Sequence, residues 1–361
     1  MKKIVSAVLC LVMALFMFVG CAEDIIGEYM DQYEKPTKKE NITLNLYIIC
    51  DAATTGNALD TVRERIKTYT SDNYGTTLNV IYCSDENYAA KITEKTAAGA
   101  TDHADIFLIN SESMFNSLYA AGRLANITTY LNGTAYGTLN SEITDSLIDA
   151  SAVLVDGKSA NYCVPNNHVV GQYKYLVIDK EIARKYYYSD EVLKTYTSIE
   201  ALQNDENANL WKDLVDDEID PSQYIYYEDE RVMYEDKAVI EADGNICNIS
   251  VYPTATKADV YSSAFAISAN SVSVERSMEM IYAINKDTDL CNYLQYGILG
   301  TNYLQNEDDS IVRVKDGVND YIMNPLYTGN IFKMLYCEEL EWLPEDAANG
   351  TNQNRESIYA N

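Results

Sequence analysis

The chain has 361 residues and a formal charge of −28, from 55 acidic and 27 basic residues. Apolar residues make up 47% of the sequence, which is ordinary for a globular protein and allows a sizeable core. A surface this acidic repels nucleic acid and anionic lipid headgroups, so neither is expected as a partner, and solubility is its simplest role.

The first 21 residues predict a secretory signal peptide. Lys2 and Lys3 are followed by an almost wholly apolar run at 4–20, which is marginal for a bilayer span of about 20 residues. The run ends in Gly20-Cys21, which resembles a bacterial lipobox, where the cysteine becomes the lipidated N-terminus. An ordinary cleaved signal is the alternative. Lipidation of Cys21 predicts a chain anchored to the extracellular face of the cytoplasmic membrane.

Removal of this segment leaves 340 residues with a formal charge of about −30, enough for two lobes or domains. Residues 22–41 are charged and contain Pro36, so we expect a flexible tether that holds the folded part clear of the membrane. No later stretch is long or apolar enough to span a bilayer.

Residues 42–121 alternate between strand and helix patterns. Runs rich in β-branched and aromatic residues predict strands at 42–50, 77–82 and 105–109. Apolar residues at helical spacing predict helices at 58–70, 87–98 and 111–121. This order implies a parallel sheet with right-handed crossovers.

The second half of the chain has less regular patterns. Asp156-Gly157 predicts a turn between two strands. The following Lys158-Ser159 does not complete a phosphate loop, because position 152 is alanine rather than glycine. Further expected elements are a strand at 173–179, a helix at 180–187, an acidic helical region at 189–236, a hairpin at 238–252, a strand at 259–269, a helix capped by Ser273, a helix at 288–296, a polar hairpin at 306–314, a helix capped by Thr328 and a loose tail after Pro344.

Cysteine and histidine usage argues against a metal or redox site. None of the cysteines forms a C-x-x-C pair, which excludes a zinc ribbon and a thioredoxin-like site. Cys50, Cys83 and Cys163 lie in or beside apolar strand patterns, where buried free thiols are expected. Disulfides are possible outside the cell, and the sequence does not pair them. His103 and His168 alone do not form a metal cage, so no metal or cofactor is expected.

No catalytic set is apparent, and we do not expect an enzyme. The chain has no G-x-S-x-G elbow, and neither histidine has an obvious serine partner. A glycosidase is the enzyme alternative, and it would need two carboxylates that face each other across a cleft.

Four stretches in order resemble the extracellular solute-binding proteins of bacterial ABC importers, in family 1, which includes maltose and oligosaccharide binders. They are residues 118–131 (LYAAGRLANITTYL), 156–179 (beginning DGKSANYCVP), 264–300 and 321–332 (YIMNPLYTGNIF). The resemblance covers most of the mature chain and is weakest around 189–252.

This resemblance implies an α/β, two-lobed periplasmic-binding-protein-like (type II) fold, with a β-sheet flanked by helices in each lobe and a multi-strand hinge. Lobe 1 would comprise 42–168 plus 258–298, and lobe 2 would comprise 169–257 plus 299–361. The chain would cross between the lobes at 166–173, 252–259 and 297–303.

The resemblance also implies a function. A membrane-anchored monomer would capture a sugar or oligosaccharide in the cleft between its lobes, close on it, and deliver it to the permease subunits of an ABC transporter. A surface glycan-binding or sensory lipoprotein without a transport role is the alternative.

Ligand-binding side chains are expected at the carboxyl ends of strands and at the crossings. The polar candidates are Asp51, Thr54, Thr55, Asn110, Ser111, Asn166, Asn167 and His168. Tyrosine, with 31 copies, can stack on sugar rings, and the candidates near crossings or helix ends are Tyr252, Tyr296, Tyr303 and Tyr327. The alternatives are helix capping for the loop at 51–55 and for Ser111, and core or surface packing for each tyrosine.

Overall fold

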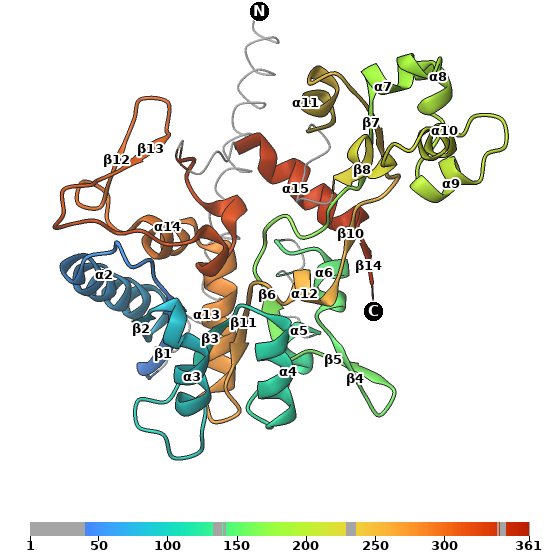
Figure 1. Ribbon diagram of the computed structural model, residues 1–361. Helices are drawn as coiled ribbons and strands as arrows, with labels where there is room; N and C mark the ends of the chain where they lie inside the picture. The colour runs from blue at the N-terminus through green and yellow to red at the C-terminus, as the bar shows by residue number, and fades with distance from the viewer. Residues whose placement is uncertain are drawn as a thin grey trace, which may run out of the picture. The chain divides into compact units, whose positions relative to one another are not determined.

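The computed structural model describes residues 40–132, 139, 142–228, 236–337, 339 and 344–360 (Figure 1). The expected signal peptide with Cys21, and all but the last two residues of the expected tether, lie outside the described residues. The chain divides into two units, 1–42 and 43–361, and the description below concerns the second. Within the described residues, no helix combines the length and apolar character needed to cross a bilayer.

The first sheet has the strand order β2-β1-β3-β11-β6. The strands are β1 Ile42–Ile49, β2 Thr76–Cys83, β3 Ile106–Ile109, β6 Cys163–Pro165 and β11 Ala264–Ile267. β1 and β3 are parallel, with Leu46 opposite Ile106, whereas β11 runs antiparallel to both of its neighbours. Every residue of β3 and β11 is buried, so both faces at the centre of this sheet are covered.

Helices of 9 to 19 residues accompany this sheet. They are α2 Gly56–Tyr74, α3 Asp85–Lys95, α4 Glu112–Ala120, α13 Val274–Lys286 and α14 Thr288–Tyr296. The helices expected from periodicity in this region are confirmed to within a few residues. α2 ends at Gly75, whose φ of 60° is left-handed and therefore suits glycine.

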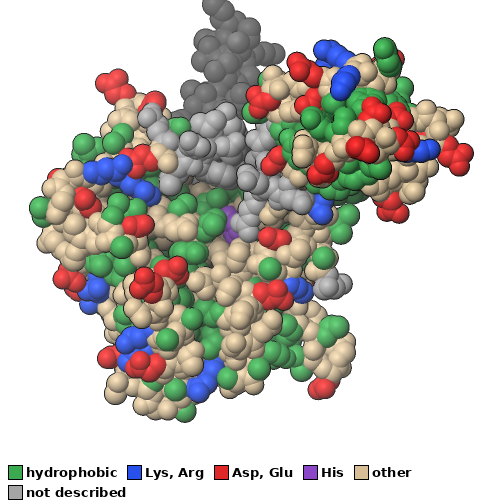
Figure 2. Space-filling view, in the orientation of Figure 1, with side chains coloured by type: hydrophobic (Ala, Val, Ile, Leu, Met, Phe, Trp, Pro, Cys, Tyr) green, Lys and Arg blue, Asp and Glu red, His purple; other side chains and the backbone are tan. Residues whose placement is uncertain are grey.

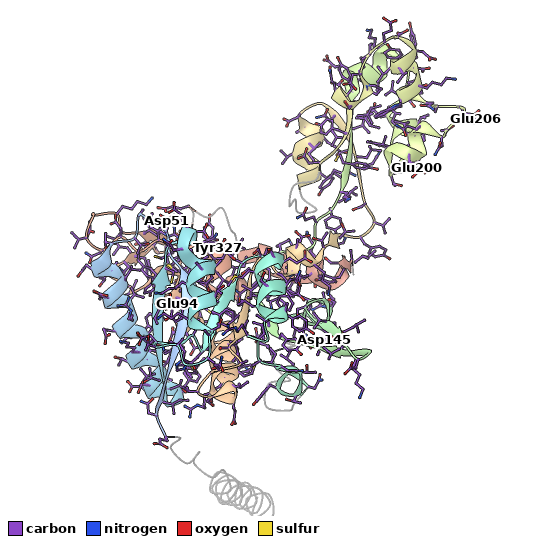
Figure 3. All side chains as sticks on the ribbon, turned by 60° about the horizontal axis from the view of Figure 1, so that its bottom comes forward. Asp51, Glu94, Asp145, Glu200, Glu206 and Tyr327 are labelled. Carbon is purple, nitrogen blue, oxygen red and sulfur yellow. The ribbon has the colours of Figure 1, made fainter. Side chains whose placement is uncertain are left out.

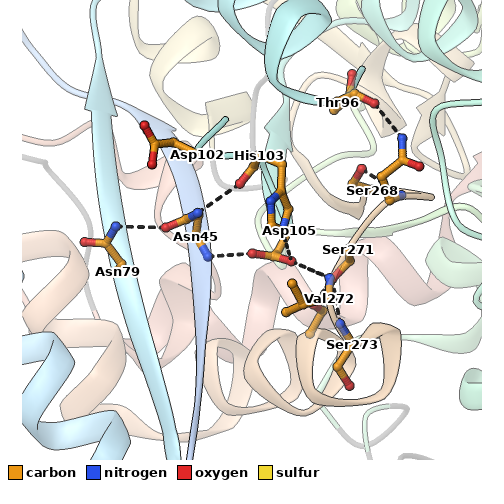
Figure 4. A network of polar contacts seen from close by, with 12 residues as sticks. Asn45, Asn79, Thr96, Asp102, His103, Asp105, Ser268, Ser271, Val272 and Ser273 are labelled. Carbon is orange, nitrogen blue, oxygen red and sulfur yellow. Dashed lines mark hydrogen bonds and ion pairs between the residues drawn. The ribbon is translucent and has the colours of Figure 1, made fainter. Parts of the chain in front are cut away.

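A buried carboxylate ties the amino end of β3 to its neighbours (Figure 4). Asp105 accepts hydrogen bonds from the backbone N–H groups of Asn45 and Val272, each at 2.8 Å, and from the Ser271 hydroxyl at 2.9 Å. The His103 imidazole Nε2 lies 3.2 Å from the same carboxylate. His103 therefore belongs to this hydrogen-bond network around Asp105.

The second sheet is a separate, smaller one with the order β8-β7-β9, all antiparallel. Its strands are β7 Tyr175–Asp179, β8 Ile225–Glu228 and β9 Asn245–Ile249. The accompanying helices are short: α7 Lys180–Lys185, α8 Asp190–Leu193, α9 Ile199–Gln203, α10 Leu210–Asp216 and α11 Asp236–Ala242. Leu176 and Ile178 face one apolar cluster, and Tyr175 and Val177 face another, so both faces of β7 are buried.

Two connections join these sheets in sequence, from β6 to β7 and from β9 back to β11. Gln172 on the first and Thr254 on the second exchange backbone hydrogen bonds of 2.8 Å. β10 (Thr254–Ala255) also pairs in parallel with β14 (Ile358–Tyr359), near the end of the chain. The crossings expected at 166–173 and 252–259 therefore have counterparts in the chain path.

The segment 299–337 differs from the expected division of the lobes. β12 (Tyr303–Gln305) and β13 (Ile311–Arg313) form a hairpin that begins three residues before the one expected at 306–314. The backbone that follows bonds to the loop before α2, with Thr55 N–H donating to the Asp320 carbonyl at 2.9 Å and Asp51 N–H to the Ile322 carbonyl at 3.3 Å. These contacts belong to the first sheet region, which is the sheet β2-β1-β3-β11-β6 with its accompanying helices α2, α3, α4, α13 and α14. They do not belong to the second sheet region, which is the sheet β8-β7-β9 with helices α7 to α11. The division into lobes remains a prediction.

Several expected elements of the second half are wrong. The hairpin predicted at 238–252 is helix α11 followed by β9, because Gly244 has φ 89° beyond the helix end and β9 pairs with β7 instead of with 238–242. The strand predicted at 259–269 begins with helix α12 (Lys257–Val260), which Thr256 and Asp259 cap reciprocally. β8, within the region predicted to be helical, was missed.

The end of the chain also differs from the prediction. Thr328 caps no helix, because the segment there forms two separate 3-10 turns, Pro325–Tyr327 and Ile331–Lys333. The tail predicted to be loose is helix α15 (Pro344–Glu356) followed by β14. Hydrogen bonds to distant residues hold this segment in place, such as the one from the Val170 N–H to the Asn354 side-chain oxygen at 2.8 Å.

Candidate ligand-binding site

A cavity of about 730 Å³ lies where β1 and β2 end, against the turn at 322–327. Its lining residues are Ile49, Cys50, Asp51, Ala52, Ser84, Asp85, Glu86, Ile322, Met323, Asn324, Pro325 and Tyr327. Figure 3 shows Asp51 and Tyr327 close together at one end of the first sheet region. The cavity thus joins three segments that are distant in the sequence.

One wall of the cavity is formed by the residues that directly follow two strands. Asp51 comes two positions after the end of β1, and its carboxylate accepts a hydrogen bond from the Ala53 N–H at 2.8 Å. Asp85 and Glu86 open α3 after the end of β2, and both are exposed. This wall therefore presents carboxylates, which can accept hydrogen bonds from ligand hydroxyl groups.

The opposite wall contributes an aromatic ring. Burial raises the pKa of the Tyr327 phenol, and the negative charge of Asp85 raises it further. The phenol is therefore protonated near neutral pH and can donate a hydrogen bond. An aromatic face opposite carboxylates suits a ligand that has both apolar and hydroxyl-bearing surfaces.

Buried and half-buried side chains hold this second wall in place. The Thr54 hydroxyl donates to the Ile322 carbonyl at 2.8 Å, and Gln295 on α14 donates to the Met323 carbonyl at 3.0 Å. The Thr328 hydroxyl donates to the Gln295 side-chain oxygen at 2.6 Å. The wall is therefore irregular in secondary structure but anchored at several points.

Three of the expected site residues cap helices or support the wall. Thr55 accepts a hydrogen bond from the Ala58 N–H at 3.3 Å and donates to the Val318 carbonyl at 2.6 Å. Ser111 accepts from the Met114 N–H at 3.3 Å. The hydroxyl of Thr54 is likewise engaged, as described above. The capping alternative thus accounts for Thr55 and Ser111, and neither they nor Asn110, half-buried after β3, line the cavity.

Asn166, Asn167 and His168 are buried at the first crossing and do not line the cavity. The Asn166 side-chain amide donates to the Ser263 hydroxyl at 2.9 Å and to the Leu326 carbonyl at 3.1 Å. His168 Nδ1 lies 2.8 Å from the Asn166 carbonyl oxygen. Direct ligand contact by these three remains a prediction.

The four expected tyrosines lie in different places. Tyr296 is buried and donates to the Leu335 carbonyl at 2.7 Å, with the ring of Tyr303 centred 5.9 Å away. Tyr303 lines a second depression, of about 460 Å³, which is separate from the cavity. Tyr252 is 53% exposed. Of these four, Tyr327 lines the cavity that also contains Asp51.

Sequence reasoning missed Ser84, Asp85, Glu86 and Asn324. The sequence did contain a signal for Ser84, Asp85 and Glu86, because they follow the end of the second predicted strand just as Asp51 follows the end of the first predicted strand. Asn324 lies within the stretch 321–332 that carried the family resemblance.

The remaining titratable groups do not suggest a further chemical site. All six cysteines of the described chain are free thiols, and burial raises the pKa of Cys83 to about 11 and of Cys163 to about 12. No cluster of three or more histidine, cysteine or acidic side chains in the described residues could hold a metal ion. Acidic side chains are spread over the visible face in Figure 2 rather than gathered in one patch.

Comparison with solved structures identifies the fold. The N-glycan transport solute binding protein NgtS from Streptococcus pneumoniae superposes with a TM-score of 0.56 at 15% identity, over 88% of this chain and 83% of that one. This chain has the fold of a two-lobed solute-binding protein. The same NgtS protein in complex with Man1GlcNAc superposes with a TM-score of 0.53 at 17% identity, over 88% of this chain and 84% of that one.

A third structure, NgtS in complex with Man5GlcNAc, gives a TM-score of 0.53 at 16% identity, over 87% of this chain and 82% of that one. No protein-family model and no curated protein matches the sequence. The α/β two-lobed fold predicted from the four resembling stretches is confirmed. At this identity the likeness establishes the solute-binding protein fold alone.

Proposed function

We propose that this chain is an extracellular, membrane-anchored solute-binding protein that captures a sugar or oligosaccharide and delivers it to the permease of an ABC transporter. The observation that carries the proposal is the cavity at the ends of β1 and β2, which Tyr327 lines together with Asp51 and Asp85. No chemical step on the ligand is proposed.

A carbohydrate fits the chemistry of this cavity. The apolar face of a sugar ring can pack against the ring of Tyr327, while its hydroxyl groups donate to Asp51, Asp85 and Glu86. The lining contains these three acidic residues and no lysine, arginine or histidine. A neutral sugar is therefore favoured over an anionic one, because a bound carboxylate would meet like charges without a compensating cation.

The structural comparisons are consistent with this ligand class. NgtS, which shares the fold, has been solved with the neutral glycans Man1GlcNAc and Man5GlcNAc. In our proposal the ligand favours a closed arrangement of the lobes, because only that arrangement contacts the ligand from both sides.

Thermal unfolding against a ligand panel tests the proposal. The panel for the chain from Ala22 onward contains Man1GlcNAc, other neutral oligosaccharides, polyols, uronic-acid oligosaccharides and short peptides. A ligand at 100 times its Kd should add about 2.7 kcal/mol to the free energy of unfolding. A shift with a neutral sugar that is recovered unaltered supports the proposal. Consumption of the sugar would indicate an enzyme instead, and a panel without any sugar response would overturn the ligand class.

The anchor and the transport partner need separate tests. In a bacterial host that lipidates secreted proteins, the full chain should incorporate a labelled fatty acid, and Cys21→Ala should abolish the label. Genes for two permease subunits beside this gene would support delivery to a transporter. A neighbouring sensor kinase gene would favour the sensory alternative.

A further inference from the structure

The wall of the cavity at 322–327 connects directly to the first crossing between the sheets. The wall consists of coil and a single 3-10 turn, Pro325–Tyr327, so it has no helix or strand to define its position. The Leu326 carbonyl within that turn accepts hydrogen bonds from the Asn166 amide, at 3.1 Å, and from the Ser263 hydroxyl. Asn166 is the first residue after β6, where the chain leaves the first sheet.

The three groups form a closed set of hydrogen bonds. Besides its bond to Leu326, Asn166 Nδ2 donates to the Ser263 hydroxyl at 2.9 Å, and the Asn166 N–H donates to the Ser263 carbonyl at 3.0 Å. Ser263 directly precedes β11, a central strand of the first sheet. The turn that carries Tyr327 is thus bonded both to the sheet and to the connecting segment.

Burial makes this arrangement sensitive to change. Asn166 and Ser263 are both fully buried, and the Asn166 Oδ1 atom has no hydrogen-bond partner within the described residues. Burying an amide without full pairing is unfavourable, so this asparagine is costly as a simple core residue. The bonds that the side chain does make are all directed at Ser263 and Leu326.

We propose that Asn166 is a positioning residue, which holds the Tyr327 wall of the cavity through Leu326 and couples it to the segment connecting the two sheets. This role differs from the direct ligand contact expected from the sequence, which remains a separate prediction. The consequence for affinity rests on the proposed function, whereas the consequence for the wall does not.

Hydrogen–deuterium exchange of the folded chain from Ala22 onward tests the positioning role without a ligand. In Asn166→Ala, peptides covering 322–328 should exchange about tenfold faster than in the wild type, because the turn loses a buried anchor. Ser263→Ala removes the second anchor and should accelerate the same peptides. If Asn166→Ala does not fold, the Ser263→Ala variant alone still decides the test.

Asn285→Ala is a matched control. Asn285 on α13 is also fully buried, bonds through Nδ2 to the Ile281 carbonyl at 2.9 Å, and leaves its Oδ1 atom without a partner in the described residues. It makes no hydrogen bond to the wall at 322–327. This variant should lose stability without selective exchange at 322–328. The proposal is overturned if exchange at 322–328 accelerates equally in Asn166→Ala and Asn285→Ala, or if it accelerates in neither variant.

A binding measurement extends the test to the ligand. By titration calorimetry with Man1GlcNAc, or with the neutral sugar that responds in the panel, Asn166→Ala should bind about tenfold more weakly than Asn285→Ala. Equal affinity in the two variants would refute coupling to the site. If the wild type binds no sugar at all, the proposed function fails, and the exchange measurement alone decides the role of Asn166.

Discussion

The first and second sheet regions differ in how strongly the local sequence specifies their helices and strands. The first has helices of up to 19 residues, and its central strands are buried along their whole length. The second has helices of 4 to 7 residues around three short antiparallel strands. Long amphipathic helices are legible in the sequence, whereas helices of one or two turns depend on tertiary packing for their existence.

The same contrast applies to polar residues. In the first region, buried polar groups such as Asp105 and Asn166 bond segments that are far apart in the chain. In the second region, most polar side-chain contacts are near the surface, such as the Lys180–Asp190 ion pair between α7 and α8 at 2.6 Å. Loss of a polar group should therefore cost more stability in the first region than in the second.

The largest effect is expected from Asp105→Ala. The change leaves the Asn45 and Val272 N–H groups without their acceptor inside the protein, so the free energy of unfolding should fall by about 3 kcal/mol. Urea denaturation measures the loss. Glu64→Ala, at an exposed side chain whose ion pair is with the partly exposed Lys67, is the control and should change stability little. Similar losses in the two variants would contradict the importance of the Asp105 network.

Tyr327→Ala should affect binding rather than folding. Removing the ring opposite the carboxylates should weaken sugar binding about thirtyfold, as measured by calorimetry with the ligand from the panel. Tyr252→Ala is the matched control, because Tyr252 is exposed and does not line the cavity. An unchanged affinity in Tyr327→Ala would remove this cavity from consideration as the binding site.

Thiol labelling of the native protein compares the local stability of the two regions. Cys163 on β6 and Cys247 on β9 are both fully buried, and burial raises their pKa to about 12 and about 11. Neither thiol is reactive near neutral pH until the structure around it opens. We expect Cys247 to be labelled about tenfold faster, because the smaller region opens more readily. Mass spectrometry identifies the labelled peptides, and equal rates would show that the regions open together.

The smallest effect is expected from Lys180→Ala. The Lys180 ammonium donates a hydrogen bond to the Asp190 carboxylate and thereby lowers the pKa of Asp190 below its ordinary value. Burial raises the pKa of Asp190, but this effect is the smaller one. Because the folded-state pKa is the lower one, the pair stabilises the fold above the unfolded-state pKa and loses that effect as pH falls through the folded-state pKa.

The variant should therefore lower Tm slightly at pH 7, and the difference from the wild type should vanish in acid. Lys174→Ala, an exposed lysine without an ion pair in the described residues, should show no such pH dependence. A difference between Lys180→Ala and the wild type that persists in acid would show that Lys180 acts through packing instead of charge.

The sequence by itself determined the order of elements from β1 to α4. Period-2 and period-3.6 patterns are properties of contiguous residues, and they remain readable when the elements are long. The same local logic correctly identified the turn at Asp156-Gly157 and the end of α14 at Gly297. The expectation that polar groups follow strand ends pointed to Asp51, which lines the cavity, and the same expectation applied to β2 would have found Asp85.

The tertiary structure alone decided what the second half of the chain became. Asp243-Gly244 is compatible with a hairpin turn or a helix end, and pairing of β9 with β7 selects the helix end. α15 has little local apolar pattern, and its order depends on bonds to distant residues such as Val170. The burial of Asn166 against Leu326 joins residues 160 positions apart. No local pattern encodes such a contact, because it exists only once the sheets have formed.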